Sequence, residues 1–264
     1  MKPPTIGVLS FLAGVRREGF LAFIGSVWRE HGDVFQVRIG RKTMLFAMHP
    51  DAVAHVSVDN RDNYAKLETY DAVRDYLIGE GLVASNGELW RRQRKLMAPF
   101  FTPKSITTYA AVMIRDAETL GERWEGLATE GGEVEIAEEM TLVTASIILQ
   151  AMFSTQTVEA VRQMKEAVET MVAYANRRMV GFVPPLWVPT PFNQRYKRVR
   201  KLVYDTISGL IAERRATPEA DWPDDLLSRL MNARDEETGE PMTELLLRDE
   251  SITICSTSTP RVGA

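Results

Sequence analysis

From about residue 86 onward the sequence is a succession of long helix-forming segments, and this pattern constrains the fold more than any other feature. Apolar side chains recur there at helical spacing. The segments that we expect to be helical are 104–128, 137–153, 158–178, 193–216 and 224–234, with one more beginning near Thr243. Proline-rich breaks at 181–191 and 218–223 separate the later helices. The pattern predicts a mainly α fold.

The segment before residue 86 supplies the β structure. A helix is expected over 18–31, where the sequence His-Gly-Asp then ends it. Two strand-like runs, 34–39 and 43–48, flank a short turn that contains Gly40, which predicts a β-hairpin. Pro50 opens a short helix. A further strand is expected at 133–136, so the fold is mainly α with a small β part near its N-terminus.

Two helix starts carry recognisable caps. Ser85 and Glu88 have the spacing of a capping box, in which each side chain bonds a free amide of the first turn. Thr102 followed by Pro103 gives a capping hydroxyl and a proline at the first helical position. These signals place helix starts near residues 86 and 103.

The composition excludes several classes of protein. Lys and Arg total 32 against 36 Asp and Glu, a net charge of −4 that argues against a general nucleic-acid binder. The single cysteine, Cys255, cannot form an internal disulfide or a zinc site of paired cysteines. With three histidines, a histidine-rich metal site is not expected. We therefore expect a soluble globular protein of the cytoplasm.

No segment is expected to span a membrane. The uncharged stretch 3–15 is shorter than the ~20 apolar residues that a span needs, and no signal-peptide cleavage site follows it. The uncharged stretch 140–158 is rich in Ser, Thr and Gln, which indicates a buried helix.

One pair of side chains suits the binding of an anion. Trp90 and Arg94 are four residues apart and lie on one face of the expected helix. An indole N–H and a guanidinium fork together suit a carboxylate or a phosphate. The alternative is that Trp90 packs in the core and Arg94 pairs with a nearby acid, and the spacing alone leaves both interpretations open.

The stretch 79–101 resembles the helix C region of the cytochrome P450 family, the haem-thiolate monooxygenases. The match consists of G-x-G-L at 79–82, W-x-x-x-R at 90–94 and F-F at 100–101. The hairpin with its flanking segments is similar to the family's first β-sheet with helices A and B, and 242–250 is similar to the opening of helix I. The resemblance covers about residues 18–254. It implies the N-terminal portion of the P450 fold: the small β-hairpin region, helices A to H and the start of helix I.

This resemblance implies roles for individual residues. Trp90 and Arg94 would bind the propionates of a haem cofactor, iron-protoporphyrin. Arg91, Arg92 and Lys95 would face an electron-donor protein of the ferredoxin or reductase type, with a solvated basic face as the alternative. Residues of the B–C and F–G loops would line the site of an apolar substrate, although an ordinary apolar core explains each of them nearly as well. These are Tyr70, Tyr76, Leu77, Ile78, Val83, Met171, Met179 and Phe182.

The resemblance ends after residue 254. The family's oxygen-activation segment, its helix K motif and its cysteine loop have no counterpart, so no catalytic residue and no metal ligand are expected in this chain. Cys255 lacks the surrounding Phe and Gly residues of that loop and is not expected to bind iron. The sequence predicts an incomplete domain over 1–254, followed by an unrelated tail at 255–264 that a frameshift or a truncation would explain.

Two functions are compatible with these features. By resemblance, the complete protein is a haem- and O2-dependent monooxygenase of an apolar small molecule, and the present chain by itself is expected to be inactive. The alternative is a non-enzymatic all-α binding or regulatory module. Its contact surface would be the basic run in 195–201, for which a solvated helix face is the simplest explanation.

Overall fold

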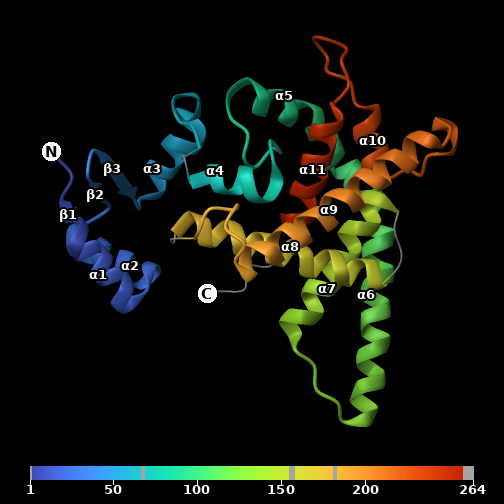
Figure 1. The fold of residues 1–264 in the computed structure, drawn as a ribbon, viewed down its shortest axis with the longest axis horizontal. Coiled ribbons are helices and arrows are strands. Elements are labelled where there is room, and N and C mark those ends of the chain that lie inside the picture. Colours follow the sequence, from blue (N-terminus) through green and yellow to red (C-terminus); the bar gives the residue numbers. More distant parts are fainter. Residues whose placement is uncertain (1, 67–68, 155–157, 181–182, 258–264) are drawn as a thin grey trace. The chain divides into compact units, whose positions relative to one another are not determined.

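The computed structural model describes residues 2–66, 69–154, 158–180 and 183–257, and it is mostly helical with one small sheet, as predicted. The contacts divide the chain into two compact units, residues 1–65 and 66–264. Figure 1 shows the helices of the second unit and the strands of the first.

The sheet of the first unit has three strands in the order β1-β2-β3. The predicted hairpin is present as β2 (Val34–Ile39) and β3 (Lys42–Ala47), which pair antiparallel around a turn at Gly40 with φ 60°. The sequence did not predict β1 (Thr5–Gly7), which pairs parallel with β2. A strand of three residues carries no alternation pattern, so its partner decides its conformation.

Two helices pack against this sheet where the sequence predicted one. They are α1 (Val8–Glu18) and α2 (Phe20–His31), separated by Gly19 at φ 81°. Their buried residues form a small core with Phe35 and Val37 of β2. Phe35 also stacks on Phe46 with ring centroids 5.0 Å apart.

The first unit ends in short helical turns. The helix at Pro50 is α3 (Pro50–Ala54), which is continued by η1 (His55–Asp59) and η2 (Arg61–Asn63). The Nδ1 atom of His49 accepts a hydrogen bond from the Asp51 amide and caps α3.

The second unit contains the predicted series of helices, most of them within two or three residues of their expected bounds. They are α4 (Thr69–Val73), η3 (Arg74–Ile78), α5 (Gly87–Met97), η4 (Ala98–Phe101), α6 (Pro103–Glu130), α7 (Ile136–Phe153), α8 (Val158–Val180), α9 (Pro191–Ala216), η5 (Glu219–Asp221), α10 (Leu226–Asn232) and α11 (Glu244–Thr257). Helix α11 continues to Thr257, so residues 255–257 of the expected tail are helical.

One predicted cap is confirmed and one is wrong. The Thr102 hydroxyl accepts from the Ser105 amide and caps α6 as expected. Ser85 does not cap α5: the N-cap residue is Asn86, and the Ser85 hydroxyl donates instead to Gln93 at 2.5 Å. The Ser85 hydroxyl therefore bonds the buried Gln93 side chain and not the free amides at the start of α5.

The strand expected at 133–136 is also wrong. Residues 132–135 are irregular and α7 begins at Ile136. The Glu135 carboxylate accepts from the amides of Ala137 and Glu138 and so caps the helix. No strand among the described residues pairs with this segment, and its residue Glu135 caps α7 instead.

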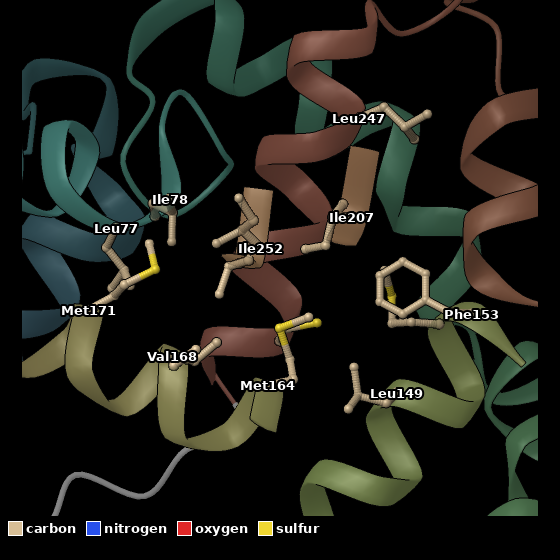
Figure 2. Packing of buried hydrophobic residues seen from close by; sticks show 14 of the residues in the cluster. Leu77, Ile78, Leu149, Phe153, Met164, Val168, Met171, Ile207, Leu247 and Ile252 are labelled. Atoms are coloured by element: carbon tan, nitrogen blue, oxygen red, sulfur yellow. The ribbon is translucent and has the colours of Figure 1, made fainter. Parts of the chain in front are cut away.

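The core of the second unit surrounds α11. Figure 2 shows side chains of η3, α7, α8, α9 and α11 gathered in one space around Ile252, which is 0% exposed. Helix α11 contacts α7, α8, α9, α10 and η3. A helix with so many neighbours has little surface left, which explains why five consecutive residues, 249–253, are buried.

Helix α7 is the one helix of the described residues whose length and composition would allow it to cross a membrane. It is long enough and apolar enough to do so, with a mean hydropathy of 1.4, and a third of it is buried within the structure. Core helices of water-soluble proteins meet the same criterion. The buried positions Ala145, Leu149, Met152 and Phe153 belong to the shared core, as the sequence predicted for this stretch.

A buried ion pair joins α9 to α10. The Arg214 guanidinium donates to both carboxylate oxygens of Asp225, at 2.7 and 2.8 Å, and the two side chains are 11% and 3% exposed. Asp225 also caps α10 through the Ser228 amide and accepts from the Ser154 hydroxyl. This single carboxylate thus connects three segments of the chain.

Candidate functional site

The segment that leads into α5 lies directly against α11. Gly79 has φ 58°, and a Cβ there would lie 2.0 Å from the Asp249 carboxylate. A Cβ at Gly81 would lie 2.0 Å from Thr253 Oγ1 and 2.9 Å from the Asp249 carbonyl oxygen. The two glycines of the 79–82 motif are therefore required by close packing between two segments distant in sequence.

Helix α5 is fixed to this segment by a buried glutamine. Gln93 is 1% exposed, donates to the Glu80 carbonyl at 2.7 Å and accepts from Ser85. Leu96 and Met97 are buried on the same helix, and Leu89 is half-buried. A glutamine within a strongly basic helix gave no signal in the sequence, because its role depends on where the 79–86 segment folds back.

Trp90 and Arg94 lie side by side on the more open part of α5. Trp90 is half-buried, with the Lys66 ammonium 5.9 Å from its ring centroid. Arg94 is exposed, and within the described part of the chain no carboxylate pairs with it. The neighbouring acid that the alternative interpretation required for Arg94 is not found there, so its guanidinium is available to a carboxylate from outside.

The other cations of α5 have partners. Arg92 pairs with Asp235 at 3.0 Å, and Lys95 lies 3.1 Å from Glu236 and 3.3 Å from Glu237. Arg91 lies 3.8 Å from Glu88. The hydrogen bond to Glu236 is the main cause that raises the pKa of Lys95. The basic face predicted from the sequence is thus covered in part by an acidic turn, residues 235–237.

That acidic turn is itself ordered by its backbone. Asp235 Oδ1 accepts from the amides of Glu237 and Thr238, and the bond to Thr238 is the main cause that lowers the pKa of Asp235. The turn therefore presents an ionised Asp235 carboxylate to Arg92 of α5 at neutral pH.

The residues predicted to line a substrate site fall into two groups. Leu77, Ile78 and Met171 are buried in the shared core, where Figure 2 shows them. Four others have exposed or half-buried side chains, and Phe182 lies outside the described residues. These four are Tyr70, Tyr76, Val83 and Met179.

Tyr76 belongs to a packed aromatic cluster. Its ring lies 5.4 Å from that of Tyr174, which stacks on Tyr196 at 3.9 Å. The Arg178 guanidinium lies 4.9 Å from the Tyr76 ring centroid and donates to the Tyr174 hydroxyl. Burial raises the pKa of the Tyr196 hydroxyl well above its ordinary value, so this phenol is protonated at neutral pH.

Cys255 is buried within α11 and lies beside Ala145, Leu149 and Met164. Burial raises the pKa of its thiol to about 12, so the group is protonated at neutral pH. Cys255 therefore lies on a helix within the packed core and not in a loop. Among the described residues, no cluster of three or more His, Cys, Asp or Glu could hold a metal ion.

The structure also contains a surface pocket that the sequence did not reveal. Its volume is about 540 Å³, and it lies between the end of α5 and the α10 region, with Phe100, Trp222 and Arg229 among its lining residues. Arg229 pairs with Asp224, and the Trp222 indole donates to the Thr217 carbonyl. The side chains of Trp222 and Arg229 are thus already bonded within the protein.

Comparison with known proteins identifies the family. The family model for cytochrome P450 matches residues 2–259. The chain belongs to the cytochrome P450 family. Pentalenene oxygenase of Streptomyces avermitilis is 28% identical over 96% of this chain and 58% of its own length. Cyclooctat-9-en-7-ol 5-monooxygenase of Streptomyces melanosporofaciens is 30% identical over 88% of this chain and 49% of its own length. The chain spans about half the length of the relatives that it matches.

The residues present fit one edge of a haem and not its iron. A haem carries two propionate carboxylates, and the exposed Arg94 beside the Trp90 indole offers donors of the right chemistry. Cys255, the single cysteine of the chain, is buried on helix α11. Trp90 and Arg94 together, the haem-edge site, would hold a haem by its propionates.

Proposed function

We propose that this chain is the N-terminal part of a haem-dependent monooxygenase that hydroxylates an apolar organic molecule. The observation that carries the proposal is the haem-edge site, in which Arg94 is exposed and unpaired among the described residues beside Trp90. Family membership and relatives named as an oxygenase and a monooxygenase support the reaction class. Haem, when bound, supplies the oxygen chemistry of the family.

The residues of this chain would bind and orient the cofactor. Arg94 would donate a charge-assisted, bidentate hydrogen bond to a propionate, a contact of ~1.5–3 kcal/mol. Trp90 would contribute its indole N–H and an apolar ring edge. Tyr70, Val83 and Met179, whose side chains keep exposed surface, are the predicted substrate contacts that remain accessible to an apolar molecule.

We also propose that Arg92 and Lys95 take part in docking an acidic electron-donor protein. Their present partners are Asp235, Glu236 and Glu237, and an acidic donor would replace these surface ion pairs by equivalent ones. Such an exchange costs least at Lys95, whose pairs with Glu236 and Glu237 are exposed on both sides, whereas the Asp235 side chain is only 11% exposed.

Spectroscopy of the chain alone tests the iron site. A reduced, carbon-monoxide-treated sample of the 264-residue protein should lack the absorption band of thiolate-ligated haem, because its single cysteine is buried and protonated. The appearance of that band would show that Cys255 binds iron and would overturn the assignment.

A chimera tests the haem-edge site. Residues 1–254 are joined to the part of pentalenene oxygenase that lies beyond the matched region, and haem content per protein is measured. The variant Arg94→Ala should weaken haem binding by about ten- to a hundredfold, which is the loss of one charge-assisted contact. Arg91→Ala, on the same helix, is the matched control and should retain haem. Loss of haem in the control with retention in Arg94→Ala would refute the assignment.

A further inference from the structure

Two adjacent buried carboxylates of α11 accept hydrogen bonds from the backbone of the 79–86 segment. Asp249 Oδ2 accepts from the Glu80 amide at 2.9 Å, and Glu250 Oε2 accepts from the Leu82 amide at 3.1 Å. Asp249 is 5% exposed and Glu250 is 0% exposed. Neither carboxylate was singled out from the sequence, and neither has a role in the proposed function.

The carbonyl groups of the same segment are held by a lysine. Lys66 Nζ donates to the carbonyls of Leu82 and Ser85 at 2.9 and 2.6 Å. Its own amide donates to Asn86 Oδ1 at 3.0 Å. The segment therefore gives its amides to two carboxylates and its carbonyls to one ammonium, which fixes the backbone immediately before α5.

The two carboxylates differ in one respect. The second oxygen of Asp249, Oδ1, accepts from the Arg248 guanidinium at 2.8 Å. The second oxygen of Glu250, Oε1, is buried and has no hydrogen-bond partner within the described structure. An ionised carboxylate with a buried, unpartnered oxygen is unfavourable, and a proton on that oxygen removes the charge.

We propose that Asp249 and Glu250 are positioning residues that hold the 79–86 segment against α11, and that Glu250 holds it more tightly in its protonated form. By fixing the start of α5, they also set the orientation of Trp90 and Arg94. That last consequence rests on the proposed function, whereas the holding of the segment does not.

The charges around Glu250 support a dependence on pH. Burial is the main cause that raises the pKa of Glu250 from 4.5 to about 7; the charge of Asp249 raises it further, and the Leu82 amide and the Lys66 ammonium oppose these effects. Arg248, the other charged neighbour on α11, is engaged by Asp249. No charged group described on α7, α8, α9, α10 or η3 contributes to this shift.

The sign of the dependence follows from linkage. Glu250 binds its proton more tightly when the segment is held than when the carboxyl is exposed to water, where its pKa is 4.5. The added stability of the held state is therefore fully present below about pH 4.5 and is lost as the pH rises to about 7. Above pH 7 both states are ionised and no further change is expected.

Hydrogen–deuterium exchange of the whole 264-residue chain tests this proposal. Peptides that cover 79–86 are followed at pH 5 and pH 7.5, with each rate corrected for the intrinsic effect of pH. The expected result is exchange about tenfold slower at pH 5. A peptide from β2 and β3, in the other compact unit, is the internal reference and should show the same corrected rate at both pH values.

Variants separate the two carboxylates. Glu250→Gln copies the neutral form, so its 79–86 peptides should be equally protected at both pH values, at the level of the unmodified protein at pH 5. Asp249→Ala should speed exchange at both pH values and keep the pH dependence, with circular dichroism confirming that the helices remain. Glu244→Gln, at the exposed start of α11, is the matched control and should change nothing. A pH dependence that survives in Glu250→Gln, or is absent from the unmodified protein, would overturn the proposal whatever the outcome of the haem measurement.

Discussion

The carboxylates of the interior and those beside the basic face of α5 are used in different ways. Arg214 and Asp225 are 11% and 3% exposed and make two short hydrogen bonds to each other. Lys95 and Glu236, on the surface, are 50% and 75% exposed and lie 3.1 Å apart. Similar ion-pair distances therefore occur in two environments whose solvent screening differs strongly.

This difference determines which contacts fix the structure and which can be exchanged. Removal of one partner from a buried pair leaves an uncompensated charge in a medium of low dielectric constant. Removal of one partner from an exposed pair leaves a charge that water solvates again. The interior contacts of Asp225, Asp249 and Glu250 therefore set the geometry of the second unit, while the exposed pairs of Lys95 on α5 can be broken at little cost.

The largest effect is expected from Asp225→Ala. The substitution leaves the Arg214 guanidinium buried without its carboxylate and also removes the cap of α10. We expect a loss of ~3–5 kcal/mol in the free energy of unfolding, measured by urea denaturation. The control is Asp224→Ala, which breaks the adjacent pair with Arg229 at a side chain that is 72% exposed. That variant should lose no more than ~1 kcal/mol, and equal losses in the two variants would contradict the comparison.

An intermediate effect is expected from Gly81→Ala. The added Cβ would lie 2.9 Å from a backbone oxygen of α11, so one of the two segments must shift. Overpacking of this kind costs ~1–3 kcal/mol, measurable as a lower urea midpoint. Gly126→Ala in α6 is the control, because a Cβ there meets nothing within 4 Å and alanine favours a helix. The interpretation of the motif as a packing requirement fails if both variants are stabilised alike.

The smallest effect is expected from Arg92→Ala and Lys95→Ala. Each removes one cation, 37% exposed for Arg92 and 50% exposed for Lys95, from its pairs with the turn 235–237 and should lower the free energy of unfolding less than either substitution above. The small loss should shrink further in 1 M salt, where the screening length is ~3 Å. Urea denaturation at low and high salt measures both. A salt-independent loss of several kcal/mol would place these pairs with the interior contacts.

Local patterns in the sequence were sufficient for the elements of this protein. Helical periodicity placed α6 to α9, alternation and Gly40 placed the hairpin, and Thr102 placed a cap, since each signal acts over a few neighbouring residues. The spacing of Trp90 and Arg94 likewise fixed their common helix face. Family membership was also readable from ordered motifs, and the family match over residues 2–259 confirms it.

Tertiary structure alone decided what surrounds those elements. The Ser85 hydroxyl bonds Gln93 and does not cap α5 as expected. Glycine is needed at position 81 because α11 packs against it. Arg92 pairs with Asp235, which lies 143 residues further along the sequence. The Leu82 amide donates to Glu250, which lies 168 residues further along. No local propensity specifies such partners, because they depend on how helices dock after they form. The buried carboxylates of α11 are therefore visible only in the folded chain, where desolvation gives an ordinary glutamate its unusual pKa.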